Sequence, residues 1–157
     1  MADGSRFAGG LVAHSLADTE NLARRIASGL RAGDTLALEG DLGAGKTTLA
    51  RAILRELGVT GAIPSPSFAL VQEYEAPALR VAHCDLYRIE RPAELDELGL
   101  EEALSGGAAI IEWADRAPAR IAQDALTIRI GILGESERSM QLSGPARWAH
   151  LLATESV

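Results

Sequence analysis

Residues 40–47 have the sequence Gly-Asp-Leu-Gly-Ala-Gly-Lys-Thr, which matches the G-x-x-x-x-G-K-[ST] pattern of a phosphate-binding loop. Lys46 is the only lysine in the chain, whereas the other fourteen basic residues are all arginine. Glycines let a backbone turn sharply and approach a ligand closely, so that successive N–H groups can surround phosphate oxygens. The pattern therefore predicts a nucleoside-triphosphate site.

The residues of this loop have distinct predicted roles. A helix that begins at about Lys46 would direct the positive end of its dipole at the phosphates. Lys46 would contact the β- and γ-phosphates as a compact charge, and the Thr47 hydroxyl would ligate Mg²⁺. The other predicted nucleotide contacts are Asp41, Leu42, Gly43, Ala44, Gly45 and Thr48. The alternative for the motif is an ordinary glycine-rich turn before a helix, but the preceding apolar run at 35–39 favours the phosphate loop. Asp41 has an alternative of its own, a surface residue of the loop that makes no nucleotide contact.

Two further apolar runs end in a carboxylate, at Asp85 and at Glu112. In open α/β sheets the ligand site lies at the carboxyl ends of the strands, so both acids are expected near the loop. Mg²⁺ prefers oxygen ligands, and we assign Asp85 to its shell. Glu112 would hold the metal, directly or through water, or orient the attacking water. Surface carboxylates at strand ends are the alternative for both.

Composition and charge limit the class of protein. The 157 residues are 47% hydrophobic and 24% charged, which fits one globular domain spanning residues 1–157. A net charge of −7 argues against a broad electrostatic grip on nucleic acid, but not against a protein partner that holds it. The single cysteine, Cys84, allows no internal disulfide. No apolar stretch reaches membrane-spanning length and the start does not resemble a signal peptide, so we expect a cytoplasmic protein.

Hydrophobic periodicity and turn residues predict the elements that position this chemistry. We expect strands at residues 11–14, 35–39, 68–74, 79–85, 108–112, 126–133 and 139–142. We expect helices that begin at residues 18–20 and at Lys46, and short helices at 92–98, 100–104 and 146–153. Short turns pair the third strand with the fourth and the sixth with the seventh as antiparallel hairpins. The predicted fold is α/β: a single P-loop NTPase-like domain with a mixed, mainly parallel central sheet flanked by helices.

Four segments together resemble a known family. They are Gly-Asp-Leu-Gly-Ala-Gly-Lys-Thr-Thr at 40–48, Ser-Pro-Ser-Phe at 65–68, His-Cys-Asp-Leu-Tyr-Arg at 83–88 and Glu-Trp at 112–113. In this order they resemble the TsaE (YjeE) family of bacterial ATPases, which serve the formation of threonylcarbamoyladenosine on tRNA. The resemblance covers about residues 15 to 145, which we take as the core. The loop is shared with many NTPases, whereas the combination is much more specific.

The resemblance implies a weak ATP hydrolase that uses ATP and Mg²⁺. Its partners would be the TsaD and TsaB proteins, which carry out the transfer, so that tRNA is reached only indirectly and no membrane is involved. Matched by motif, Asp85 and Glu112 serve the metal and water, and Trp113 lies beside the nucleotide. The further implied residues are the nucleotide contacts Thr19 and Arg138 and the switch-loop residues Ser65 and Ser67, the last of which stands where the family usually has threonine.

Other classes of protein also contain a phosphate-binding loop. A small-molecule P-loop kinase usually has a mobile lid that carries arginine, but residues 94–107 contain none. A GTPase of the usual kind needs an N-K-x-D motif, which a chain without a second lysine cannot have. A nucleotide sensor without catalysis is distinguished by Glu112, because only an enzyme loses hydrolysis when this carboxylate becomes an amide. We expect slow turnover by the protein alone, since no arginine finger is assured.

Overall fold

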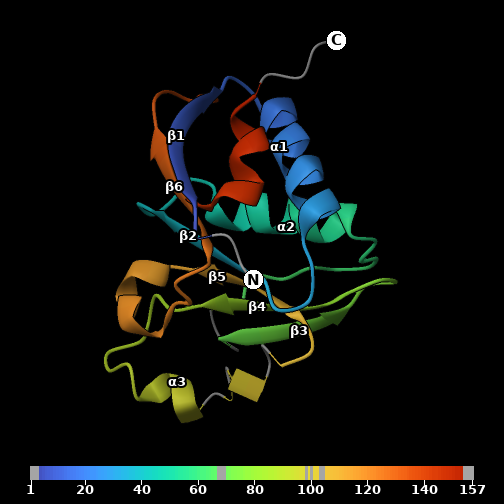
Figure 1. Cartoon of the computed structure of the whole chain (residues 1–157), viewed down its shortest axis with the longest axis vertical. Helices are drawn as coiled ribbons and strands as arrows, with labels where there is room; N and C mark the ends of the chain where they lie inside the picture. Colours follow the sequence, from blue (N-terminus) through green and yellow to red (C-terminus); the bar gives the residue numbers. More distant parts are fainter. Residues whose placement is uncertain (1–3, 67–69, 98, 100, 103–104, 154–157) are drawn as a thin grey trace.

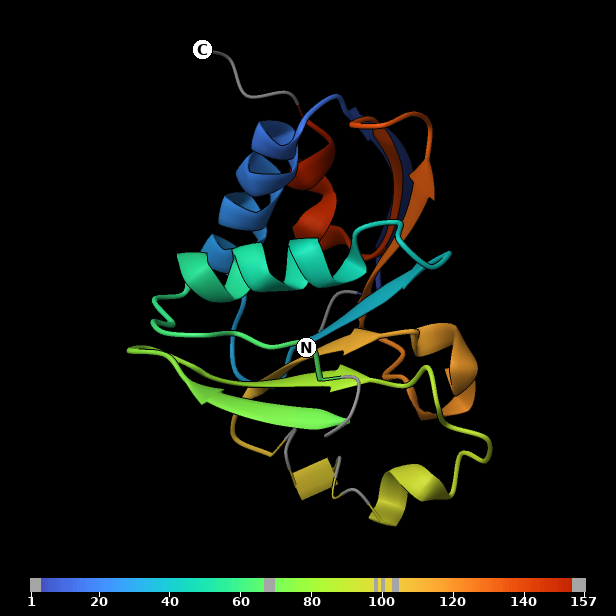
Figure 2. The same ribbon diagram turned by 180° about the vertical axis from the view of Figure 1, so that it is seen from behind.

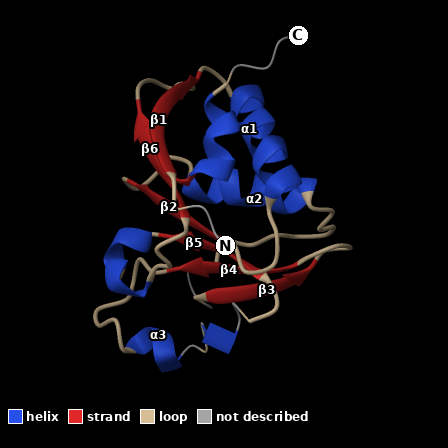
Figure 3. Cartoon of the chain, viewed as in Figure 1, coloured by secondary structure: helices blue, strands red, loops and turns tan. Residues whose placement is uncertain are grey.

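The computed structural model describes residues 4–66, 70–97, 99, 101–102 and 105–153. Its strands are β1 Arg6–Ala13, β2 Thr35–Gly40, β3 Val71–Glu75, β4 Arg80–Asp85, β5 Ala108–Glu112, β6 Leu126–Ile132 and β7 Arg138–Pro145. Its helices are α1 Leu16–Gly29, α2 Lys46–Glu56 and α3 Glu94–Glu97, and its 3-10 turns are η1 Ala114–Arg116, η2 Pro118–Arg120 and η3 Ala146–Leu152. Figures 1 and 3 show these elements around one twisted sheet.

The sheet has seven strands in the order β1-β7-β6-β2-β5-β4-β3. Its centre is parallel, because β2 pairs in parallel with β5 and β6, and β4 pairs in parallel with β5. The outer pairs β1–β7, β6–β7 and β3–β4 are antiparallel. This confirms the predicted fold class, a mixed sheet that is parallel in the middle, and both predicted hairpins. The carboxyl ends of β2, β4 and β5 consequently meet at one edge, where the phosphate loop leaves β2.

Helices cover both faces of the sheet, as the opposite views in Figures 1 and 2 show. The helices α1 and α2 and the turn η3 pack on one face, over a core that includes Leu36, Leu38 and Ile110. The helix α3 and the turn η1 lie on the other face, where a smaller core includes Ala37 and Ile111. Because both faces are covered, β5 is buried at every position and is apolar up to its terminal glutamate.

Several element ends differ from the prediction. The first helix begins at Leu16, not at 18–20, because the Ser15 hydroxyl caps it by accepting a bond from the Asp18 N–H. The strand β1 begins at Arg6, five residues earlier than predicted, because it pairs along its whole length with β7. Its two glycines disfavour a strand in the sequence pattern, so this pairing was not predicted. The strand β7 likewise extends to Pro145, and the last helix is a 3-10 turn.

Part of three predicted elements falls on residues that the structure does not describe. The strand predicted at 68–74 is described from Val71 and extends to Glu75. The helix predicted at 92–98 is described as Glu94–Glu97. Of the helix predicted at 100–104, only residues 101–102 are described, and they are helical.

No helix among the described residues is long and apolar enough to cross a membrane. Cys84 is fully buried, and burial raises the pKa of its thiol to about 12.

The first loop glycine, Gly40, is fixed by close packing. It has a φ of +144°, and a Cβ there would lie 2.4 Å from the carbonyl oxygen of Ile130. We expect Gly40→Ala to lower the free energy of unfolding by about 2–4 kcal/mol, through backbone strain and overpacking. The control is Gly61→Ala, where φ is +81° and a Cβ would meet no described atom within 4 Å; it should cost about 1–2 kcal/mol. Urea unfolding measures both, and equal losses would contradict the packing argument.

Candidate functional site

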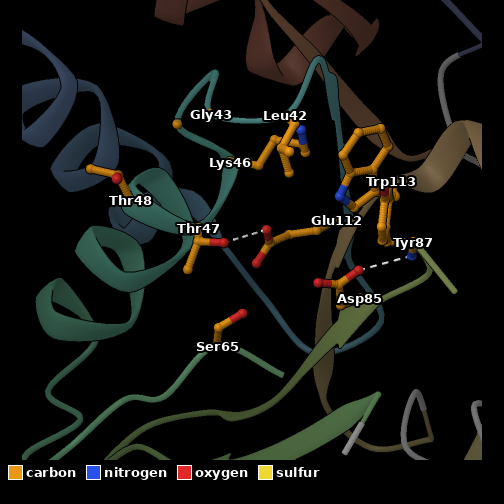
Figure 4. A pocket seen from close by; sticks show the side chains of 11 residues that line it. Leu42, Gly43, Lys46, Thr47, Thr48, Ser65, Asp85, Tyr87, Glu112 and Trp113 are labelled. Carbon is orange, nitrogen blue, oxygen red and sulfur yellow. Dashed lines mark hydrogen bonds between the residues drawn. The ribbon is translucent and has the colours of Figure 1, made fainter. Parts of the chain in front are cut away.

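The phosphate-binding loop connects the carboxyl end of β2 to the start of α2 (Figure 4). Gly43 and Gly45 have φ angles of +81° and +113°, which favour glycine, and a Cβ at either would meet no described atom within 4 Å. Gly45 is the N-cap of α2 and supplies no side-chain cap. No side chain therefore accepts a hydrogen bond from the first N–H groups of α2, and these groups face the loop. Such N–H groups at a helix N-terminus can bind an anion.

The side chain of Lys46 lies inside this loop and is only 5% exposed. Its Nζ donates to the carbonyl oxygens of Gly40 at 2.6 Å and Asp41 at 2.9 Å. It also lies 3.9 Å from the centre of the Trp113 ring, a cation–π distance. Burial lowers the pKa of Lys46, although nearby carboxylates, Glu112 foremost, oppose this. Neutral carbonyls and a ring bind an ammonium less strongly than anionic oxygens do, so Lys46 can exchange them for a phosphate.

Two carboxylates and a hydroxyl converge beside the loop from three elements. Asp85 and Glu112 end adjacent parallel strands and are paired in register. The Thr47 hydroxyl, in the first turn of α2, donates to Oε1 of Glu112 at 2.6 Å (Figure 4). Oδ1 of Asp85 accepts from the Tyr87 N–H at 2.8 Å. Both acids are almost fully buried, at 5% and 2% exposure. The prediction that the two acids lie near the loop is confirmed, and surface carboxylates are excluded.

This donor set fits Mg²⁺. No group of three or more His, Cys, Asp and Glu side chains forms a metal cluster within the described ranges. Mg²⁺ does not need one, because it keeps several waters and is held by one or two carboxylates together with substrate phosphates. Thr47, Asp85 and Glu112 are oxygen donors of that kind, beside the loop that is predicted to bind phosphate. The residues present therefore fit a magnesium–nucleotide complex.

Sequence reasoning missed the partner of the buried His83. Its Nε2 lies 2.5 Å from Oε2 of Glu112, and the ring has no exposure to solvent. The signal was the alternation along β4, which places His83 and Asp85 on one face. Which side chain of β5 they would meet depends on the strand register.

An aromatic pair lines one side of the site. The Tyr87 and Trp113 rings have their centres 4.8 Å apart with an angle of 48° between their planes. Trp113 has a left-handed backbone with φ of 58°, an uncommon conformation for a bulky residue. The Arg116 guanidinium carbon lies 5.2 Å and 5.6 Å from the two ring centres. Trp113 therefore lines the pocket as predicted, whereas Tyr87 was not predicted; its position two residues after Asp85 was the available signal.

These groups enclose one cavity of about 340 Å³. The predicted residues that line it are Leu42, Gly43, Gly45, Lys46, Thr47, Thr48, Ser65, Asp85, Glu112 and Trp113. Two residues predicted as nucleotide contacts, Asp41 and Ala44, do not line this cavity. The Asp41 carbonyl accepts a hydrogen bond from Lys46, and the Ala44 side chain is buried in the core. Nucleotide contact by these two residues stays a prediction. Ser67 of the predicted switch loop lies outside the described residues.

Thr19 and Arg138 do not line that cavity. They line a second cavity of about 260 Å³, which shares Gly45 and Thr48 with the first. Arg138 Nε donates to the Ala44 carbonyl at 2.9 Å, and its Nη1 donates to the carbonyls of residues 134 and 137 at 2.8 and 2.9 Å. In this structure Arg138 therefore ties the phosphate loop to the β6–β7 turn. Nucleotide contact by Thr19 or Arg138 stays a prediction.

The sequence and fold are similar to those of known proteins. Residues 13–140 match the family described as Threonylcarbamoyl adenosine biosynthesis protein TsaE. The chain is 38% identical to the tRNA threonylcarbamoyladenosine biosynthesis protein TsaE of Rickettsia bellii over 128 residues, covering 81% of this chain and 89% of that one. It is 36% identical to the Bacillus subtilis protein of the same name over 139 residues, covering 88% and 87% of the two chains.

A solved structure has the same fold. The crystal structure of YdiB from Bacillus subtilis matches with a TM-score of 0.75 and 29% identity, over 95% of this chain and 94% of that chain. Sequence and fold thus agree over most of the length, and the matched range contains the loop, both carboxylates and the aromatic pair. The chain therefore belongs to the TsaE family, whose description assigns it to threonylcarbamoyladenosine biosynthesis.

Proposed function

We propose that this chain is a cytoplasmic ATPase that binds ATP with Mg²⁺, hydrolyses it slowly, and acts as an accessory subunit of TsaD and TsaB in forming threonylcarbamoyladenosine on tRNA. One observation carries the ATPase proposal: the loop lysine, the helix hydroxyl and two buried carboxylates line a single cavity. The biosynthetic context comes from the family and from the names of the relatives. A net charge of −7 supports contact with tRNA only through the partners.

Each residue has a role that follows from its position. The N–H groups of the loop and of the first turn of α2 bind phosphate oxygens, and Lys46 neutralises charge on them. Mg²⁺, when bound, neutralises charge on the β- and γ-phosphate oxygens. Thr47 and Asp85 would hold this ion. Glu112, which is buried and accepts two hydrogen bonds, would orient the attacking water or contribute to the metal shell.

The cavity lining explains why turnover should be slow. No arginine is among the described residues that line the site, and Arg116 packs against the aromatic pair. An arginine that reaches the transferred phosphoryl group is worth about 10³–10⁵ in rate. A partner protein could supply such a group. The site therefore supports an enzyme that depends on its partners.

The test is ADP production by the full chain, with and without the cognate TsaB–TsaD pair, with the Lys46→Ala variant as the blank. We expect slow release alone and faster release with the pair, both absent in the blank. ADP release that ignores the pair and rises only with an added small metabolite would favour the kinase and overturn the proposal. Nucleotide binding with no hydrolysis under either condition would favour a sensor.

Trp113 should report nucleotide binding by its fluorescence. Its ring lies 3.9 Å from the Lys46 ammonium, a contact that should weaken when Lys46 turns to phosphate. The other tryptophan, Trp148, is 1% exposed in the core on the α1 side and should not respond. We expect a saturable change in emission on titration with Mg²⁺ and ATP. Trp113→Phe should lose the change, and a full response in that variant would contradict the assignment.

A further inference from the structure

We propose that His83 is a positioning residue for hydrolysis, which holds the Glu112 carboxylate by Oε2 so that its orientation persists when Thr47 leaves Oε1. The inference rests on the proposed function, because it assigns to Glu112 a part in the reaction. Figure 4 shows the Thr47 bond to Glu112 inside the cavity. His83 does not line the cavity and can act only through the carboxylate.

The position of His83 follows from the sheet. Side chains alternate along a strand, so His83 and Asp85 face the same side of β4, as Ile110 and Glu112 do on β5. His83 is paired with Ile110, and Glu112 lies two residues further along β5. That side is the one covered by α2, because Ile110 packs in the same core as the α2 residues Leu49 and Ile53. The imidazole therefore bridges two strands beneath the helix that carries Thr47.

The two oxygens of the Glu112 carboxylate have different partners. Thr47 Oγ1 donates to Oε1 at 2.6 Å, and His83 Nε2 lies 2.5 Å from Oε2. Carboxylate oxygens accept hydrogen bonds, so we assign Nε2 of the ring as the donor. With Glu112 at 2% exposure, these bonds replace the hydration that the carboxylate has lost. If Thr47 is taken up by Mg²⁺ ligation, His83 is the partner that remains.

Packing alone does not explain a histidine at this position. The ring is fully buried, and its Nδ1 has no hydrogen-bond partner among the described residues. A buried nitrogen without a hydrogen-bond partner lowers the free energy of unfolding. An apolar side chain of similar size would avoid this cost. The feature that an apolar side chain could not supply is the donor aimed at Glu112. The contact with Glu112, and not packing in the core, therefore accounts for a histidine at this position.

Two amide variants separate positioning from packing. His83→Gln places an amide nitrogen near the place of Nε2, whereas the shorter His83→Asn places it near that of Nδ1, out of reach of Glu112. With TsaB–TsaD present, we expect His83→Asn to lower kcat about 10–100-fold, as loss of an outer-shell partner does. The affinity for ATP in the presence of EDTA, read from Trp113 fluorescence, should change less than about 3-fold in His83→Asn. His83→Gln should stay within a few-fold of wild type in both kcat and this affinity. A residue needed only for packing would lower the melting temperature without separating the two amides.

A second measurement does not depend on turnover. The contribution of Mg²⁺ to ADP binding, measured by calorimetry with and without EDTA, should fall about 10-fold in His83→Asn and recover in His83→Gln. In the Glu112→Gln background, His83→Asn should cause no further loss of kcat, because the two residues act as a unit. Equal effects of both amides, or an additive loss in that background, would overturn the positioning role. If the wild type makes no ADP but the two amides still differ in the Mg²⁺ contribution, the proposed activity fails, and what stands is that His83 holds the Glu112 carboxylate.

Discussion

Replacing Lys46 by alanine should abolish measurable ATP hydrolysis, a loss of at least about 10²–10³-fold. The ammonium is the only lysine charge in the chain and lies within the loop, where burial has already removed much of its hydration. Its partners in this structure are two carbonyl oxygens and the Trp113 ring, which hold it at the place where phosphate charge would arrive. Turnover of ATP to ADP with the TsaB–TsaD pair measures the effect.

Lys46→Arg is the matched control for charge. Arginine keeps the positive charge but has a planar fork with longer reach, which does not fit between the Gly40 and Asp41 carbonyls as a compact ammonium does. We expect it to bind ATP and Mg²⁺ more tightly than the alanine variant and still to hydrolyse it poorly. Full activity in either variant, with circular dichroism showing a native fold, would refute the assigned role of Lys46.

The sequence predicted the site better than it predicted the contacts within the site. Lys46 and Thr47 belong to a local pattern whose spacing fixes its own geometry, and Asp85 and Glu112 end strands whose carboxyl ends must meet in a parallel sheet. The bond from His83 to Glu112 depends on strand register, which no local pattern encodes. The sequence therefore predicted which side chains form the site but not the hydrogen bond by which His83 holds Glu112.

The fold shows the same division between local and distant information. The run at 108–112 is apolar because both faces of the sheet are covered, and it was predicted to the residue. The start of β1 at Arg6 depends on β7, more than 120 residues later in the chain, and was missed. Arg138 was predicted as a nucleotide contact from the resemblance, whereas its observed bond to the Ala44 carbonyl requires the β6–β7 turn to lie beside the loop. Sequence periodicity does not reveal which strands and loops far apart in the chain contact one another.

Converting Glu112 to glutamine should separate binding from hydrolysis. The amide has nearly the shape of the carboxylate and can still accept the Thr47 bond, so ATP binding read from Trp113 should persist. It lacks the charge and basicity needed to orient and activate water, so we expect hydrolysis to fall about 10²–10⁴-fold. Steady-state ADP release with TsaB–TsaD, alongside the fluorescence titration, measures the two effects separately.

The control for Glu112→Gln is Glu39→Gln, a glutamate near the end of the neighbouring strand β2. Glu39 makes an ion pair with Arg129 at 3.2 Å and does not line the cavity. Its replacement should leave hydrolysis within about 2-fold of wild type, since an exposed pair contributes little. Wild-type hydrolysis by Glu112→Gln would move the water-positioning role to Asp85 or to the partner proteins. Loss of ATP binding together with hydrolysis would show that Glu112 holds the metal, because a ligand to Mg²⁺ affects both, whereas a residue that only orients water affects the rate alone.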